Sequence, residues 1–187
     1  MRESVHDCVV AFGAMSTANL ELRDSAATEA AGARLASALA GGMIVTLSGD
    51  LGAGKTTLVR GCLRALGWAG SVKSPSYPLV EHYPLSSLYF YHFDFYRFAD
   101  PSEWDTAGLA DCFGPDAVCL IEWPERVAGR LPPPDVALTL MYPADPSRSG
   151  RELALMAQTE GGERCLAAMM SVNVRRAPSV LSRKFTR

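Results

Sequence analysis

The segment GDLGAGKTT, residues 49–57, decides which fold this sequence is expected to adopt. It matches the pattern GxxxxGK[ST], whose defining positions are held by Gly49, Gly54, Lys55 and Thr56. An almost wholly apolar run at residues 43–48 precedes it and predicts a strand buried on both faces, and residues 55–66 predict a helix after it. A strand, a glycine-rich loop and a helix in this order predict a phosphate-binding loop.

Such a loop binds a nucleotide largely through its backbone. Glycines allow successive N–H groups to point at the phosphates, and the positive end of the following helix faces the same anion. Lys55 is expected to reach the β- and γ-phosphates, and the Thr56 hydroxyl is expected to bind magnesium. We therefore expect ATP as the substrate, Mg²⁺ as the cofactor, and nucleotide contacts from the whole loop: Gly49, Asp50, Leu51, Gly52, Ala53, Gly54, Lys55, Thr56 and Thr57.

The segments around the loop predict an α/β domain. Asp24 or Ser25 can cap a helix over residues 27–39, and the glycine pair at residues 41–42 would end it. Further along, the pattern predicts a strand over 117–123, a β-hairpin of strands over 135–142 and 151–157, and a short helix over 163–170. These elements indicate a three-layer P-loop NTPase-like fold with a central, largely parallel sheet and a C-terminal β-hairpin.

Length and charge indicate one domain with two appendages. At 187 residues, nearly half of them apolar, the chain can bury one core but not two. We expect an ATPase domain over residues 19–170, after a flexible N-terminal extension over residues 1–18 and before a disordered basic tail over residues 171–187. The tail contains no acidic residue, and its basic residues are Arg175, Arg176, Arg183, Lys184 and Arg187. Such a tail can bind RNA or an acidic partner, but most are simply solvated, so we assign it no role.

Cysteine and hydropathy patterns indicate the compartment. The five cysteines are scattered without a CxxC pair, which favours reduced thiols over a zinc or redox site. No stretch approaches the roughly 20 unbroken apolar residues of a membrane span. Polar residues Glu3, His6 and Asp7 stand where a signal peptide needs its apolar segment. We therefore expect a cytoplasmic protein that does not contact a membrane.

Two acidic residues are candidates for the chemistry. Residues 88–96 alternate so that His92 and Asp94 share one face of a strand. A carboxylate among aromatic residues needs a cation, a metal or a water that it positions. We expect Asp94 to orient the attacking water, the structural alternative being an ion pair with Arg97. His92 fits a hydrogen-bonded core histidine better than a catalytic residue.

The second acid, Glu122, ends the apolar run of residues 117–123. A carboxylate at the end of such a strand holds magnesium in phosphate-loop proteins, so we expect Glu122 to act beside Thr56. Trp123 could cover the nucleotide, or it could pack at the rim of the core. Residues 72–83, VKSPSYPLVEHY, are expected to form an extended turn that resembles a switch loop.

Four linked segments resemble the TsaE family of bacterial ATPases, formerly called YjeE. These segments are GDLGAGKTTLVRG, VKSPSYPLVEHY, YHFDFYRFADPSEW and LIEWPER, and the resemblance covers roughly residues 20–170. It implies the same roles for Lys55 and Thr56, matches Asp94 to the acid of the family's HxDxYR segment, and matches Glu122 and Trp123 to its EW pair. The chain has Ser74, Pro75 and Ser76 where the family usually has SPT, and the retained hydroxyl leads us to expect retained function.

The same resemblance implies further contacts and partners. Arg151 resembles an arginine region near the nucleotide, and Thr28 matches a threonine of the family's first helix. The family acts with TsaB and TsaD to make threonylcarbamoyladenosine beside the anticodon of tRNAs that read codons starting with A. TsaD transfers the threonylcarbamoyl group and ATP hydrolysis supports repeated turnover, so the resemblance implies that tRNA is contacted indirectly.

The expected mechanism is in-line attack of water on the γ-phosphate. Arg97 is the candidate arginine finger, and no other is evident in the sequence. We therefore expect slow hydrolysis by the isolated chain and faster hydrolysis with its partners.

Two other functions use the same loop. A small-molecule kinase normally needs a lid with several arginines, whereas the stretch between Gly67 and Leu88 offers only Lys73. A nucleotide-dependent adaptor would use ATP to order a docking surface, with hydrolysis incidental.

Overall fold

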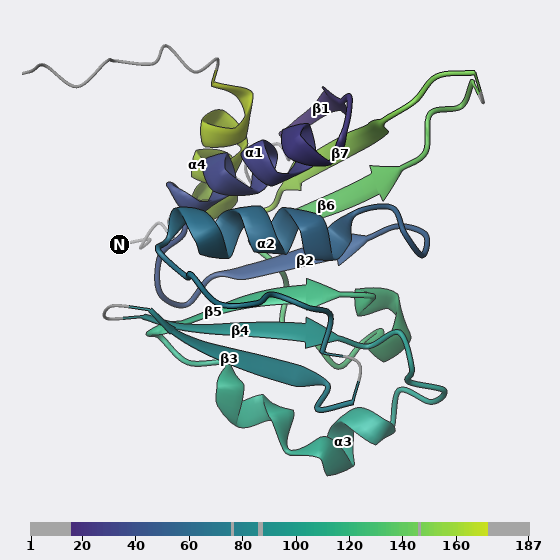
Figure 1. Ribbon diagram of the computed structural model, residues 1–187. Helices are drawn as coiled ribbons and strands as arrows, with labels where there is room; N and C mark the ends of the chain where they lie inside the picture. Colours follow the sequence, from purple (N-terminus) through teal and green to yellow (C-terminus); the bar gives the residue numbers. More distant parts are fainter. Residues whose placement is uncertain (1–15, 76, 86–87, 146, 172–187) are drawn as a thin grey trace, which may run out of the picture.

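The computed structural model describes residues 16–75, 77–85, 88–145 and 147–171. The predicted N-terminal extension up to residue 15 and the basic tail from residue 172 lie outside these residues. The described chain forms a seven-stranded sheet with helices on both faces (Figure 1). The strands are β1 (Thr17–Leu22), β2 (Ile44–Ser48), β3 (Val80–Leu85), β4 (Leu88–Asp94), β5 (Ala117–Glu122), β6 (Val136–Met141) and β7 (Arg151–Ala157).

The strand order is β1-β7-β6-β2-β5-β4-β3, with β2 at the centre. The four strands β6, β2, β5 and β4 run parallel to their neighbours, so their carboxyl ends meet at one edge of the sheet. Strands β1, β7 and β3 pair antiparallel at the two outer sides. The predicted α/β class, the parallel centre and the C-terminal hairpin of β6 and β7 are confirmed.

The helices form two layers around this sheet (Figure 1). Three helices pack on one face, and their apolar side chains share a core with the sheet: α1 (Ser25–Ala36), α2 (Lys55–Ala65) and α4 (Glu160–Met170). The other face is covered by α3 (Glu103–Ala107) and the short 3₁₀ helices η1 (Leu109–Cys112) and η2 (Pro124–Val127). Because both faces are covered, β2 and β5 are buried almost throughout, which explains their largely apolar sequences.

Helix ends follow their capping residues. The Asp24 side chain accepts a hydrogen bond from the Ala27 N–H at 2.8 Å, so α1 begins at Ser25. The helix ends at Ala36, a few residues before the predicted end at 39. Thr159 caps α4 by accepting from the Gly162 N–H at 3.1 Å, so α4 begins at Glu160 and not at the predicted residue 163.

Two edge strands were absent from the prediction. Strand β1 begins at Thr17, inside the segment predicted to be an N-terminal extension, and it lies outside the C-terminal hairpin that was expected to close the sheet. Strand β3 begins at Val80, inside residues 72–83, which were predicted to be an extended turn. Both strands expose one side, so their apolar pattern is weak. Pro84 is tolerated in β3 because that strand is at an edge.

The described cysteines are free thiols, in agreement with the predicted reduced state, and Cys8 lies outside the described residues. Burial raises the pKa of Cys62 and of Cys119 to about 12 and that of Cys165 to about 11. None of the helices in the described part of the chain has the length and apolar character that crossing a bilayer requires.

Candidate nucleotide site

The phosphate-binding loop lies at the carboxyl edge of the parallel strands, between β2 and α2. A cavity of about 340 Å³ opens beside it and is lined from four parts of the chain: the loop, Ser74, the end of β4 and the end of β5. The strand order of the sheet brings these parts together, because β5 and then β4 are the next strands on one side of β2. A crevice outside the carboxyl ends of parallel strands is the common ligand site of such sheets.

Glycines give the loop its shape. Gly54 has φ of 110° and forms the N-cap of α2, a left-handed conformation that favours glycine. Gly49 has φ of 129°, and a Cβ there would lie 2.1 Å from the Leu140 carbonyl oxygen of β6. The loop is therefore held close to the sheet with the N-terminus of α2 facing the cavity.

Lys55 is 4% exposed, and its ammonium group stays within the loop. Its Nζ donates to the carbonyl oxygens of Gly49 at 2.6 Å and Asp50 at 2.9 Å. It also lies 4.0 Å from the centre of the Trp123 ring. Burial lowers the pKa of Lys55 from its ordinary value, against the opposing attraction of Glu122 and Asp94.

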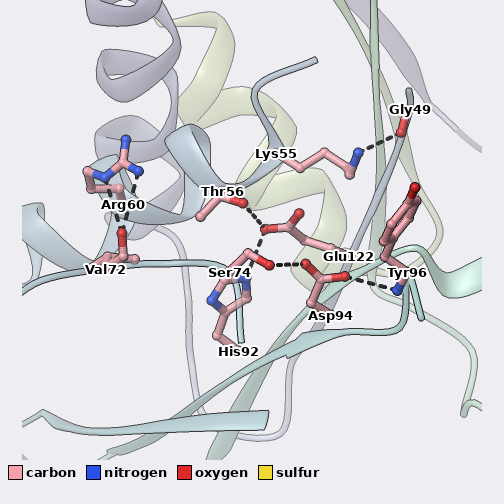
Figure 2. A network of polar contacts seen from close by, with 10 residues as sticks. All are labelled: Gly49, Lys55, Thr56, Arg60, Val72, Ser74, His92, Asp94, Tyr96 and Glu122. Atoms are coloured by element: carbon pink, nitrogen blue, oxygen red, sulfur yellow. Dashed lines mark hydrogen bonds and ion pairs between the residues drawn. The ribbon is translucent and has the colours of Figure 1, made fainter. Parts of the chain in front are cut away.

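Thr56 and Glu122 meet in the same cavity (Figure 2). The Thr56 hydroxyl donates to Glu122 Oε1 at 2.7 Å. Glu122 is 2% exposed and stands at the end of β5. A hydroxyl and a carboxylate at this position are oxygen ligands of the kind that Mg²⁺ prefers.

The donor set fits magnesium held jointly with phosphates. Among the described residues, no group of three or more His, Cys, Asp or Glu side chains could hold a metal by itself. Mg²⁺ commonly uses one or two protein ligands together with substrate phosphates and water. Thr56 and Glu122 beside a phosphate-binding loop fit that arrangement.

Asp94 stands at the end of β4, in register with Glu122 on β5. It is 7% exposed and lines the cavity. Its carboxylate accepts a hydrogen bond from the Ser74 hydroxyl and another from the Tyr96 N–H at 3.0 Å (Figure 2). The Asp94 carboxylate therefore forms these hydrogen bonds in the structure and not the alternative ion pair with Arg97. The Arg97 guanidinium lines the same cavity and lies over the Tyr77 ring, 5.0 Å from its centroid.

Trp123 follows Glu122 with φ of 59°, and its ring lies at the cavity. The Tyr96 ring packs against it at 5.0 Å between centroids. Trp123 therefore forms part of the cavity wall, with Lys55 on one side and Tyr96 on another.

A second cavity of about 300 Å³ adjoins the loop and shares Gly52, Gly54 and Thr57 with the first. It contains the two remaining residues that the resemblance suggested, Thr28 and Arg151. Thr28 is buried, and its hydroxyl donates to the Asp24 carbonyl at 3.1 Å.

Arg151 contacts the loop itself. Its guanidinium donates to the carbonyl oxygens of Ala53 and Gly52, each at 3.1 Å, and of Gly150 at 2.6 Å. It also lies over the Tyr142 ring at 4.0 Å, and the Tyr142 hydroxyl donates to the Leu51 carbonyl at 3.4 Å. Arg151 at the start of β7 and Tyr142 after β6 thus hold residues 51–53 of the loop.

The structure confirms that His92 is a buried, hydrogen-bonded histidine, and it adds two residues that the sequence analysis used little. His92 is buried and its Nε2 contacts Glu122, as expected of a hydrogen-bonded core histidine, whereas its Nδ1 has no partner among the described residues. Ser74 was named only as part of the segment that matches SPT, and Tyr142 was not considered. The shared face of His92 and Asp94 was the available signal for His92; the Tyr142 contact depends on a turn whose path no local pattern gives.

Comparisons with known proteins match this part of the chain. The family model described as "Threonylcarbamoyl adenosine biosynthesis protein TsaE" matches residues 22–152. Two proteins named "tRNA threonylcarbamoyladenosine biosynthesis protein TsaE" are similar. That of Haemophilus influenzae is 47% identical over 126 residues, which are 67% of this chain and 77% of that protein. That of Bacillus subtilis is 38% identical over 107 residues, 57% of this chain and 66% of that protein.

A solved structure has the same architecture. The crystal structure of YdiB from Bacillus subtilis matches with a TM-score of 0.70 and 26% identity, over 84% of this chain and 96% of that chain. The family match includes the phosphate-binding loop and both candidate carboxylates.

Proposed function

This chain belongs to the TsaE family, and on that premise we propose that it is a magnesium-dependent ATPase that supports threonylcarbamoyladenosine modification of tRNA together with TsaB and TsaD. The observation that carries the ATPase proposal is the convergence of Thr56, Glu122 and Asp94 on one cavity beside the loop. The role in tRNA modification is supported by the names of the relatives.

The two cavities suggest how ATP would lie. They share loop residues, so one ligand can occupy both. We place the γ-phosphate in the first cavity, near the two carboxylates, and the nucleoside in the second, near Thr28. Arg151 would then act mainly by holding the loop, because its donors are directed at loop carbonyls.

Each side chain has a defined task in this proposal. Lys55 and the loop N–H groups stabilise negative charge on the transferred phosphoryl group. Thr56 and Glu122 would hold Mg²⁺, which neutralises charge on the β- and γ-phosphate oxygens when bound. Asp94 orients a water molecule for in-line attack, because its carboxylate lines the same cavity and is already held by Tyr96.

The same geometry favours slow hydrolysis by the chain alone. Arg97 lies at the cavity but over the Tyr77 ring, so its charge is at the rim in this structure. An arginine that reaches the γ-phosphate accelerates hydrolysis by about 10³–10⁵-fold in related enzymes. We propose that TsaB and TsaD supply such a charge or move Arg97 inward, and that tRNA is contacted through that complex. Residues 19–170 would be the catalytic domain.

The test is phosphate release from ATP by the purified chain, with and without TsaB and TsaD. Lys55→Ala and Glu122→Ala should abolish partner-stimulated release, whereas Glu81→Ala, which removes an exposed carboxylate on β3, should retain it. If the wild type binds ATP but releases no phosphate under any condition, the ATPase proposal is wrong and the adaptor function replaces it.

A further inference from the structure

His92 is a buried imidazole in the middle of the aromatic strand β4. It is 0% exposed. Strand β4 lies parallel to β5, with His92 opposite Leu120 and Asp94 opposite Glu122. The histidine therefore lies two residues before the carboxyl end of β4, deeper in the sheet than the two carboxylates.

The imidazole makes a specific contact with one of these carboxylates. His92 Nε2 lies 2.9 Å from Glu122 Oε1, the same oxygen that accepts from the Thr56 hydroxyl at 2.7 Å. Figure 2 shows both contacts converging on that oxygen, with the second carboxylate oxygen directed away from His92. Because a carboxylate only accepts hydrogen bonds, Nε2 is the protonated nitrogen in this contact.

The other ring nitrogen argues against a purely structural role. Nδ1 is buried and has no partner among the residues that the structure describes. A buried polar atom without a partner is unfavourable, and a phenyl ring would fill the same space without this penalty. The neighbouring positions Phe90 and Phe93 show that β4 accommodates such rings. Within the described part of the chain, the His92 side chain forms a hydrogen bond to Glu122 and to no other residue.

We propose that His92 is a positioning residue that fixes the Glu122 carboxylate for the magnesium ion of the bound nucleotide. This inference rests on the proposed function, since it needs Glu122 as a magnesium ligand. A glutamate has three side-chain torsions, and two donors on Oε1 restrict them. With that oxygen fixed from one side by Thr56 and from the other by His92, the second oxygen keeps a constant position at the cavity. Loss of the His92 contact leaves Thr56 alone to orient the carboxylate.

Three substitutions of His92 distinguish its hydrogen bond to Glu122 from its packing in the core. His92→Gln keeps an N–H donor at about the distance of Nε2, whereas the shorter His92→Asn places its amide near Nδ1 and cannot reach Glu122. His92→Phe keeps an aromatic ring of similar size and removes both nitrogens. Partners of metal-binding side chains typically contribute 10–100-fold to metal affinity or activity.

The measurement is ATP affinity by calorimetry, once with excess Mg²⁺ and once with EDTA. In the wild type, Mg²⁺ should tighten ATP binding. His92→Asn and His92→Phe should reduce this tightening by about 10-fold or more while the affinity in EDTA stays unchanged, and His92→Gln should retain most of it. The unchanged affinity in EDTA also establishes that each variant is folded.

The possible failures are distinguishable. If all three variants keep the full magnesium effect, His92 is a core residue and the inference is wrong. If His92→Gln loses as much as His92→Phe, the donor at Nε2 is not what matters, and the inference is likewise overturned. If the wild type itself shows no magnesium effect on ATP binding, the proposed function fails and the inference fails with it.

Discussion

The hydroxyl of Thr56 and the carboxylate of Glu122 are 2.7 Å apart, although 66 positions separate them in the sequence. Thr56 belongs to the first turn of α2, and Glu122 is the last residue of β5. Their contact fixes the start of the helix against the end of the strand, at the place where the phosphates would bind.

This pair gives the first prediction. Thr56→Val and Glu122→Gln should each lower magnesium-dependent ATP hydrolysis by about 100-fold, because each removes an oxygen ligand or its charge. Phosphate release at saturating ATP measures the effect. Thr56→Ser is the matched control and should retain activity, since it keeps the hydroxyl; an equal loss in this variant would contradict the assigned role.

Asp94→Asn should separate binding from hydrolysis. The amide oxygen can still accept from the Tyr96 N–H, so the fold and ATP affinity should change little, but the loss of the water-orienting carboxylate should slow hydrolysis by about 100-fold or more. Single-turnover hydrolysis and equilibrium binding give the two numbers. Asp105→Asn, on α3, is the control. With TsaB and TsaD, the Asp94 variant should stall after few rounds of tRNA modification; undiminished modification would favour the adaptor function.

Arg151→Lys should weaken ATP binding by about 10-fold. A lysine cannot reproduce the planar donors that reach the Gly52 and Ala53 carbonyls, so the loop loses part of its preorganisation. Arg148→Lys is the control from the same turn, because Arg148 forms exposed ion pairs, which contribute little. Equal affinities for both variants would show that the loop keeps its shape without Arg151.

Lys55→Met should stabilise the nucleotide-free protein at pH 7. Burial lowers the pKa of Lys55 in the folded state, so the unfolded chain binds this proton more tightly and the charge opposes folding. As the pH rises toward the ordinary lysine value of 10.5, the unfolded chain loses the proton too, and the advantage of methionine should shrink. Denaturant unfolding of both proteins from pH 7 to 10 tests this. A less stable variant at pH 7 would mean that the bonds to the Gly49 and Asp50 carbonyls outweigh burial.

Gly32→Ala should destabilise the contact between α1 and α2. A Cβ at Gly32 would lie 2.0 Å from the Leu58 carbonyl oxygen, so the helices must separate, at a cost of about 1–3 kcal/mol. Gly114→Ala is the control, because no atom lies within 4 Å of a Cβ there and its φ is not positive. Thermal unfolding compares the two, and equal midpoints would contradict the tight packing.

The central fold was predictable because its signals are local. The loop at residues 49–57 lies between an apolar strand and a helix, and β5 is likewise an unbroken apolar run. The order of these segments places Thr56 and Glu122 at one edge of a parallel sheet. The edge strands β1 and β3 were missed because one side of each is exposed, so their pattern is weak and pairing with β7 and β4 stabilises them.

For the site, the sequence predicted those residues that the order of strands and loops along the chain brings together, but not the contacts that depend on strand register or loop path. The Glu122 contact of His92 depends on the register of β4 against β5, and a shift of β4 by one residue would turn His92 to the face opposite Glu122. The contact of Arg151 with the loop depends on the path of a hairpin turn. Neither register nor loop path is a property of a local segment.

The pairing of β1 with β7 also has a consequence for how the protein is made. A ribosome adds roughly 5–20 residues per second, so β1 leaves it on the order of ten seconds before β7 does. During that interval the nascent chain can assemble β2, β5, β4 and the first two helices, but the backbone of β1 has no neighbouring strand. Of the described strands, the first to be synthesised is therefore among the last to be incorporated into the sheet.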